Sequence, residues 1–189
     1  RTAMNFNTLM PQLVEMGQKT KARLLSFSYE RSPDYVTKAM RWKTSQLIQV
    51  ATRVRLIDEI PFSHLTTYVP AKVAENYSEN DLSTQPLFNL LERSGIQITN
   101  AHQTVSATLA DPEIASSIGV AVGSALLSLN RVVRDEDGNG VEYLSALYRP
   151  DMFRLEMPLK RVGQQNERHW EPTIEQLSLI HISEPTRLG

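Results

Sequence analysis

The 189-residue chain contains no cysteine, which excludes a disulfide framework, a thiolate zinc site and a cysteine nucleophile. It also lacks any apolar run close to the roughly 18 residues that a membrane-spanning helix needs, so we expect no membrane association. A basic stretch followed by an apolar one, the mark of a secretory signal, is missing, and this predicts a cytoplasmic location. Neither charge is in excess, since 20 Lys and Arg stand against 21 Asp and Glu. A free-standing DNA-binding domain usually carries a basic excess, so this balance argues against DNA binding by the chain alone.

Motifs of catalysis and of metal or cofactor binding are scarce. The four histidines are His64, His102, His169 and His181, and none has a histidine or acidic residue at metal-ligand spacing. The sequence contains no GxGxxG, no P-loop and no GxSxG. We therefore expect no metal site and no cofactor. A Ser-His-Asp arrangement remains open, because the sequence carries no local signature for or against it.

The composition is that of a globular protein, with 41% apolar and 22% charged residues, and the length suits one main domain. We expect a linker and an N-terminal helix over residues 1–22, a domain over 23–163, and a C-terminal extension over 164–189. Residues 178–189 resemble translated adapter sequence and are predicted to be non-native; the alternative is a short native tail.

An internal near-repeat is the most informative feature. Its first copy begins with an alternating strand over 24–31, followed by Ser32-Pro33-Asp34, where Ser32 suits a helix N-cap and Pro33 the first helical position. A helix to about Trp42, a strand over 46–57, a turn over 58–61 and a strand over 62–70 complete this copy.

The second copy has the same order. A strand over 103–109 leads to Asp111-Pro112-Glu113, again a cap, a proline and an acid, and a helix to about Ile118. A strand over 125–134, a Gly-rich turn over 135–140 and a strand over 141–150 follow. Two segments correspond between the copies, Arg53-Val54 with Arg131-Val132 and Tyr68-Val-Pro70 with Tyr148-Arg-Pro150.

Two copies are too few for a solenoid. The repeat instead predicts an α+β domain with pseudo-two-fold symmetry, one shared antiparallel sheet, and helices on one side of it. Amphipathic helices over 6–17 and 82–95 and a closing strand over 152–162 lie outside the repeat, and Pro158 suggests an edge position for that strand.

The candidate binding residues lie on the two hairpins. Arg53 and Arg55 are two positions apart on a strand, so both face one side and could clamp a carboxylate or phosphate; the alternative is a solvated charged face. Glu142 and Tyr148 also share a face, with small apolar residues between them. This pattern indicates a pocket wall, unless Glu142 forms a cross-strand pair with an arginine.

These hairpins resemble a known family. Arg53-x-Arg55, Tyr68-x-Pro70, Gln85-Pro-Leu-Phe-Asn-Leu-Leu-Glu-Arg-Ser-Gly95 and Glu142-x5-Tyr148-Arg-Pro-Asp151 are similar, in order and spacing, to the effector-binding domain of GntR-type transcription regulators of the HutC subgroup. This is the UbiC transcription regulator-associated (UTRA) domain, and the resemblance spans about Met4 to Val162. It implies a chorismate-lyase-like fold, a small-molecule effector, a homodimer, and DNA contact only through an N-terminal winged-helix half that this chain lacks.

The resemblance also implies roles for individual residues. Arg53 and Arg55 match arginines that contact the effector, while Glu142 and Tyr148 match residues that line the pocket. The chain departs from the family where Leu65 replaces an acidic residue.

A second departure affects the predicted ligand. Pro86-Leu87-Phe88 replaces a hydroxyl-bearing Ser-Leu-Tyr. Buried hydroxyls left without a partner cost roughly 1–3 kcal/mol each, so a sugar phosphate would find too few partners. We therefore expect an anionic effector, a carboxylate first, with an apolar body against Leu65, Phe88 and Leu144.

Two functions follow from this reading. The first, which we prefer, is the ligand-sensing domain of a DNA-binding transcriptional regulator. The second is an enzyme on the same fold, a chorismate-lyase-like protein in which an arginine holds a carboxylate and Glu142 serves as acid or base. The fold cannot choose between them; a winged helix encoded immediately upstream would support the sensor.

Overall fold

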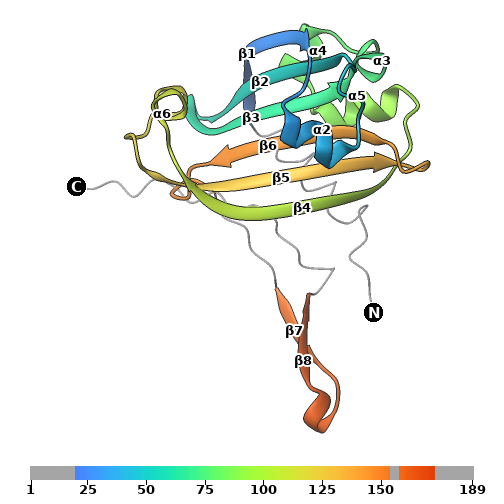
Figure 1. The fold of residues 1–189 in the computed structure, drawn as a ribbon. Helices are drawn as coiled ribbons and strands as arrows, with labels where there is room; N and C mark the ends of the chain where they lie inside the picture. Colours follow the sequence, from blue (N-terminus) through green and yellow to red (C-terminus); the bar gives the residue numbers. More distant parts are fainter. Residues whose placement is uncertain (1–19, 154–157, 173–189) are drawn as a thin grey trace.

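The computed structural model describes residues 20–153 and 158–172. Its main body is a six-stranded antiparallel sheet in the order β1-β2-β3-β6-β5-β4 (Figure 1). The strands are β1 (Lys21–Glu30), β2 (Ile48–Ile57), β3 (Ile60–Pro70), β4 (Ile98–Leu109), β5 (Ala125–Asp135) and β6 (Gly140–Tyr148). The helices are α2 (Asp34–Met40), α3 (Ala71–Ala74), α4 (Glu79–Thr84), α5 (Leu87–Arg93) and α6 (Pro112–Ile118). None of the described helices is long and apolar enough to cross a membrane.

The element order confirms the predicted repeat. The first half runs β1-α2-β2-β3 and the second runs β4-α6-β5-β6, and the two halves meet where β3 pairs with β6 at the centre of the sheet. That pairing extends from Ser63 opposite Tyr148 to Tyr68 opposite Tyr143. Each half places its first strand, β1 or β4, at an outer edge. The predicted α+β fold with one shared antiparallel sheet is therefore confirmed.

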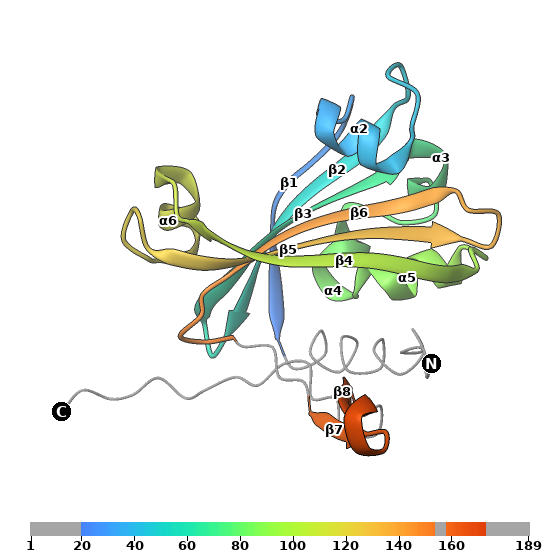
Figure 2. The same ribbon diagram turned by 60° about the horizontal axis from the view of Figure 1, so that its bottom comes forward.

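The prediction that the helices lie on one side is right only for the helices of the repeat. Helix α2 packs on the sheet face that carries Val50, and α6 packs on the same face at Leu126. Helices α4 and α5 pack on the opposite face, which carries the next residue along β2, Ala51. Figure 2 shows this arrangement, with α2 and α6 on one side of the sheet and α4 and α5 on the other. The sheet is covered from both faces because its central strands are apolar on both.

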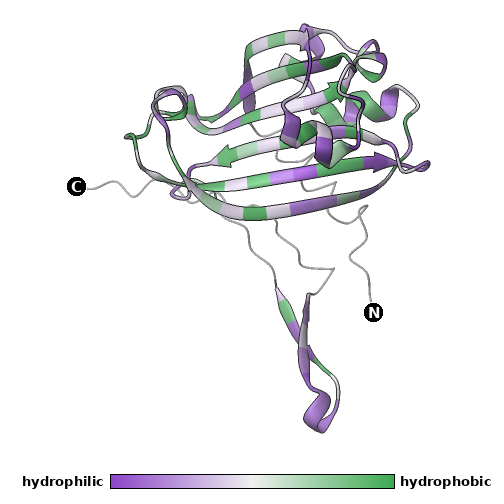
Figure 3. Ribbon diagram, in the orientation of Figure 1, coloured by the Kyte–Doolittle hydropathy of each residue, from purple (hydrophilic) through white to green (hydrophobic). Residues whose placement is uncertain are grey.

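Alternation along the strands builds these two apolar faces, and it is visible as hydrophobic and hydrophilic bands along the ribbon (Figure 3). Different helices fill the core on each face of the sheet. Leu82, Leu90 and Leu91 of α4 and α5 are completely buried against β2 and β3. Val36 and Met40 of α2 fill the other face. The predicted helix over 82–95 is in fact two helices, separated at Pro86.

The helix caps show one correct prediction and one wrong one. The Asp111 carboxylate accepts a hydrogen bond from the Ile114 amide at 2.8 Å, and Pro112 occupies the first turn of α6, as predicted. Ser32 does not cap α2. Pro33 is the N-cap residue and gives no side-chain cap, while the Ser32 hydroxyl bonds the Thr37 hydroxyl at 2.6 Å.

The closing strand predicted over 152–162 is confirmed only at Leu159–Val162, and these residues do not join the main sheet. Met152 and Phe153 are buried in a turn after β6, where the Phe153 ring stacks on Tyr148 at 4.0 Å. Strand β7 (Leu159–Val162) pairs with β8 (His169–Pro172) in a separate two-stranded sheet, with the short helix η1 (Gln165–Glu167) between them. The helix predicted over 6–17 and the tail 178–189 lie outside the described residues.

Candidate ligand-binding site

The strongest candidate site begins with two arginines on β2. Arg53 and Arg55 are separated by one residue on a regular stretch of strand, so both project from the face that α4 and α5 cover, as predicted. Arg53 is only 3% exposed, and its Nη1 donates to the Leu82 carbonyl of α4 at 3.3 Å. Arg55 is partly exposed, and its Nη1 donates to the Thr20 hydroxyl at 3.2 Å. Two guanidinium groups therefore lie side by side beneath α4.

A cavity of about 390 Å³ opens beside these arginines. Three segments form its wall: the start of β1, the middle of β2, and the end of α4 with the link to α5. The lining residues are Thr20, Lys21, Ala22, Arg53, Arg55, Ser83, Thr84, Gln85 and Pro86. This wall carries three cationic side chains and no acidic one. It is suited to a small anion.

Neither arginine is neutralised within the part of the chain that the structure describes. No described carboxylate lies within ion-pair distance of Arg53 or Arg55, and the Arg53 Nε–H is buried without a hydrogen-bond partner. Burial, together with the smaller effect of the neighbouring Arg55, lowers the pKa of Arg53 to about 10. Burial also lowers the pKa of Arg55. Both groups remain cations at neutral pH, and a bound anion would offset the cost of burying them.

The two hydroxyls on the α4 side of the cavity wall already act as donors. Ser83 Oγ donates to the Glu79 carbonyl at 3.1 Å, and Thr84 Oγ1 donates to the Asn80 carbonyl at 3.0 Å. A hydroxyl that donates its only hydrogen can still accept, so these two oxygens present lone pairs. A ligand in the cavity thus meets donors on the β2 side and acceptors on the α4 side.

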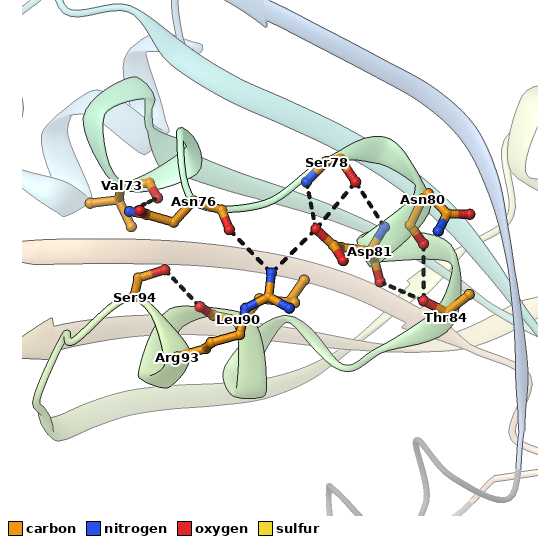
Figure 4. A network of polar contacts seen from close by, with 9 residues as sticks. All are labelled: Val73, Asn76, Ser78, Asn80, Asp81, Thr84, Leu90, Arg93 and Ser94. Atoms are coloured by element: carbon orange, nitrogen blue, oxygen red, sulfur yellow. Dashed lines mark hydrogen bonds and ion pairs between the residues drawn. The ribbon is translucent and has the colours of Figure 1, made fainter.

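A network of polar contacts fixes the α4–α5 side of the cavity (Figure 4). Ser78 and Asp81 form a capping box at the start of α4. Arg93 of α5 donates through Nη2 to the Asn76 carbonyl at 3.2 Å and to Asp81 Oδ2 at 3.3 Å. The backbone amide of Ser78, together with its hydroxyl and Arg93, holds the pKa of Asp81 below its usual value. These contacts join α4 to α5 and position the segment between them, which lines the cavity.

Four buried polar atoms on the same sheet face have no described partner. They are Gln49 Nε2, Arg53 Nε, Ser63 Oγ and Thr67 Oγ1. Most folded proteins leave few such atoms, so four on two neighbouring strands mark this face as unusual. Gln49 Oε1 does accept a hydrogen bond, from the Tyr77 hydroxyl at 2.9 Å, and burial raises the pKa of Tyr77.

The other predicted site residues do not belong to the cavity wall. Leu65 is directly opposite Arg53 on β3 and is buried. Glu142 and Tyr148 lie on β6, on the same face of the sheet as Arg53. Phe88 is a partly buried residue of α5. None of these four lines the cavity, so their role in ligand binding stays a prediction.

Glu142 is nevertheless a notable group. It is 7% exposed and makes no hydrogen bond or ion pair with the residues that the structure describes. Burial raises the pKa of its carboxyl, and the positive charges of Arg131 and Arg53 partly oppose that rise. The charged form of a buried carboxyl is costly when no partner stabilises it. A bound ligand could supply that partner, and buried groups with shifted pKa values are common at functional sites.

Sequence reasoning missed Lys21 and the polar residues at the end of α4. It also missed Gln49, Ser63 and Thr67. A signal for Ser63 and Thr67 was present, because they alternate with the apolar Leu65 and Val69 on the inward face of β3; Gln49 shares its face of β2 with the two arginines.

A larger groove of about 850 Å³ lies at the far end of β2 and β3, around the turn between β5 and β6. Arg41, Lys43, Lys72 and Arg134 contribute to its rim. None of the four buried polar atoms without a partner belongs to it. Among the described residues, no group of three or more His, Asp and Glu side chains could hold a metal ion. The arginine cavity is therefore the better candidate for a ligand site.

Comparison with known proteins gives consistent matches. The family model described as the UTRA domain matches residues 15–154. The chain is 25% identical over 158 residues to the HTH-type transcriptional regulator Rv0792c of Mycobacterium tuberculosis, a match that covers 82% of this chain and 58% of that protein. It is 24% identical over 138 residues to the HTH-type transcriptional repressor NagR of Bacillus subtilis, covering 72% of this chain and 56% of that protein. The chain thus spans little more than half the length of these two relatives.

Solved structures share the fold. The ligand-binding domain of a regulator assigned to the GntR family, from Bordetella bronchiseptica, aligns with a TM-score of 0.69 at 23% identity, covering 75% of this chain and 91% of that one. A GntR-family transcriptional regulator from Enterococcus faecalis aligns with a TM-score of 0.67 at 23% identity, covering 72% of this chain and 99% of that one.

Proposed function

The chain belongs to the UTRA domain family, and from this premise we propose that it is the effector-binding part of a DNA-binding transcriptional regulator. One observation carries the proposal. Arg53 and Arg55 are cations beneath α4, they have no described carboxylate partner, and they line a cavity large enough for a small metabolite. An effector anion is the partner that this arrangement lacks.

The proposed effector is a small anion, a carboxylate first, which also bears a hydrogen-bond donor. The anionic group would meet Arg53 and Arg55, and the donor would meet the oxygens of Ser83 and Thr84. The polar wall favours a more polar ligand body than the apolar one expected from Leu65 and Phe88. A hydroxy acid or an amino acid fits this combination.

Glu142, Tyr148, Leu65 and Phe88 are proposed to contact the part of the effector that extends along the sheet. For Glu142 and Tyr148, this proposed contact is supported by their proximity to Arg53. Both lie close enough to that guanidinium for their charges to raise its pKa, against the effect of burial. The Ser63 and Thr67 hydroxyls, which have no partner among the described residues, lie on the same face.

In the whole protein, the effector would act by mass action. We propose a cytoplasmic homodimer of the HutC subgroup whose winged-helix half, outside this chain, reads the operator. The effector would shift the balance between DNA-competent and DNA-incompetent arrangements by as much as it binds one of them more tightly. No catalytic role is proposed, since the cavity wall offers no acid and both relatives are regulators.

A thermal-shift screen of the chain tests this function. The panel would contain sugar phosphates, aliphatic and aromatic carboxylates, amino acids and chorismate. A ligand at 100 times its Kd should add roughly 2.7 kcal/mol of stability. The expected result is a carboxylate that stabilises the parent but not Arg53→Met or Arg55→Met. Arg131→Met is the matched control, because Arg131 lies on the same sheet face outside the cavity and should leave the shift intact.

Two results would contradict the proposal. If no anion in the panel stabilised the parent, or if the arginine variants responded as the parent does, the cavity would not be the effector site. If chorismate stabilised the chain and was then consumed, the chain would be a chorismate-lyase-like enzyme and the sensor proposal would be wrong.

A further inference from the structure

The groove of about 850 Å³ at the far end of β2 and β3 shares no lining residue with the arginine cavity. Its walls are the end of α2 with the loop to β2, the start of α3, and the turn between β5 and β6. Figure 2 shows these three segments at one end of the sheet, with α6 at the other end. Ligand pockets commonly have volumes of about 300–1,000 Å³, so the groove has room for a bulkier ligand than the arginine cavity.

Hydrogen bonds and close packing hold two of the walls together. Trp42 Nε1 donates to the Gly140 carbonyl at 3.0 Å, and Arg134 Nη2 donates to the Ala39 carbonyl at 3.1 Å. A methyl group on Gly140 would lie only 2.7 Å from Met40 Cε, so α2 and the β5–β6 hairpin are in direct contact. The fold therefore builds this groove without a ligand.

The lining of the groove is strongly positive. Its cationic residues are Arg41, Lys43, Lys72 and Arg134. None of these four forms an ion pair with a residue in 20–153 or 158–172. The one acidic residue of the lining is Asp135, and its Oδ1 accepts hydrogen bonds from the Asp137 and Asn139 amides of the turn, at 3.0 and 2.9 Å. Because that carboxylate is held by its own turn, the charge of the groove favours an anion.

The same lining contains apolar side chains, which an inorganic anion alone would leave in water. Leu47 is 51% exposed, and Trp42 and Val73 are only partly buried. Covering such surface stabilises a complex by the hydrophobic effect. A ligand that matches the groove therefore combines a negative charge with an apolar body.

We propose that this groove is a second ligand site, separate from the effector cavity, for a bulky anion with an apolar body. The body would cover Trp42 and Leu47, and the negative group would pair with the cations of the rim, among them Lys43 and Lys72. The inference goes beyond the proposed effector function and does not depend on it, because the two cavities have no residue in common.

Fluorescence titration with two matched probes tests the chemistry of the site. Anilinonaphthalenesulfonate carries both features, and N-phenylnaphthylamine is the same body without the sulfonate. The parent is expected to bind the sulfonate with a Kd at least about fivefold lower than that of the neutral probe, because only the sulfonate can pair with the cations. Added salt should reduce this difference, and inorganic sulfate at the probe concentration should not displace the probe.

Trp42 reports the position of the bound probe. The chain has two tryptophans, so Trp170→Phe leaves Trp42 as the only one. Binding in the groove should quench Trp42 emission as probe emission rises.

Two pairs of variants separate the charge from the apolar surface. Lys43→Gln with Lys72→Gln is expected to raise the Kd of the sulfonate about fivefold and to leave the neutral probe unchanged. Lys38→Gln with Lys160→Gln is the matched control, because these lysines are also exposed and lie outside the groove.

The second pair changes exposed leucines. Leu47→Gln should weaken both probes, and Leu109→Gln, at a leucine that is 68% exposed outside the groove, should weaken neither. Urea transitions identify any variant that fails to fold.

Arg53→Met separates this proposal from the effector proposal, and it should leave sulfonate binding unchanged. If Arg53→Met abolished binding, the probe would occupy the arginine cavity and the groove proposal would be overturned. Absence of binding to the parent would overturn it, as would unchanged Trp42 emission or a Lys43→Gln, Lys72→Gln variant with the parent's affinity. The last three results would leave the effector proposal untouched.

Discussion

Arg53 and Arg131 project from the same face of the sheet, but only Arg131 has a side-chain partner for its Nε. That group donates to Gln103 Oε1 at 2.9 Å, whereas Arg53 Nε is buried with no described partner. The repeat therefore places an arginine in each half and uses the two differently. The first half buries its arginine beneath α4, a helix that the second half does not have. The candidate site belongs to one half of a nearly symmetric fold for this reason.

The ligand-free protein should gain stability when Arg53 is replaced. Arg53→Met removes a buried cation that has no anionic partner among residues 20–153 and 158–172, and it keeps most of the side-chain volume. We therefore expect the free energy of unfolding to rise by on the order of 1–2 kcal/mol. Urea denaturation without ligand measures it. Arg131→Met should change that free energy by less than about 0.5 kcal/mol, because its hydrogen bond lies near the surface.

A fall in stability for Arg53→Met would contradict this account. It would mean that the bond from Arg53 to the Leu82 carbonyl stabilises the fold more than the buried charge destabilises it. Loss of ligand binding together with a gain in stability is the combination expected for a residue kept for function.

The pH dependence of stability should reveal Glu142. Burial raises its folded pKa above the ordinary value of 4.5, so the folded state holds a proton that the unfolded state has released over the window between these values. Stability from this group is thus fully present below pH 4.5 and is lost as pH rises through the raised pKa. Glu142→Gln removes the titration.

We therefore expect the free energy of unfolding of Glu142→Gln, relative to the parent, to increase from about pH 4 to pH 7. Urea transitions at a series of pH values measure this difference. A difference that is flat, or that shrinks as pH rises, would show that the carboxylate is stabilised in the folded protein. Asp151→Asn is a useful comparison, because the hydrogen bond from Arg149 lowers the pKa of that carboxyl and the sign should reverse.

Loss of the α6 cap should destabilise the protein. Asp111 accepts a hydrogen bond from the Ile114 amide, and Asp111→Ala leaves that amide without its partner. We expect the free energy of unfolding to fall by about 1 kcal/mol. Thermal or urea unfolding at pH 7 checks it, and Asp111→Asn, which preserves the acceptor, should recover most of the loss. Equal losses in the two variants would rule out the cap as the cause.

The sequence allowed more of the fold to be predicted than of the candidate site. Alternation, the two proline-acid helix starts and the Gly-rich turn are local signals, and they indicated the strand order of each half and the repeat. The register between strands is not local. Tyr68 and Tyr148 correspond in sequence, yet Tyr68 packs toward α2 while Tyr148 lies on the opposite face with Phe62 and Phe153.

The site depended on tertiary contacts that no spacing reveals. The alternation of Arg53 and Arg55 correctly placed them on one face, but the cavity beside them is closed by the start of β1 and the end of α4. Ser32 fails as a cap for a related reason, since its hydroxyl bonds Thr37 instead of an amide of the first turn. Where a side chain has two possible hydrogen-bond partners nearby, the sequence pattern alone does not predict which partner it bonds.

Ser83 gives the most direct test of which chemical groups of a ligand the cavity binds. Its hydroxyl donates to the Glu79 carbonyl, so its contribution to a ligand is an acceptor oxygen. Ser117 of α6 is a matched control, because its hydroxyl donates in the same way to the Ile114 carbonyl and it does not line the cavity. Ser83→Ala and Ser117→Ala should therefore have similar small effects on unfolding.

Their effects on binding should differ. For an anion that also bears a hydroxyl or ammonium group, Ser83→Ala should weaken binding about fivefold, the value of one ordinary hydrogen bond, while Ser117→Ala leaves it unchanged. For the matching anion without that donor, neither variant should matter. Isothermal titration calorimetry with the two ligands and the two variants gives all four values. If Ser83→Ala weakened both ligands equally, the hydroxyl would act by positioning the end of α4; if it weakened neither, the ligand would not reach this wall.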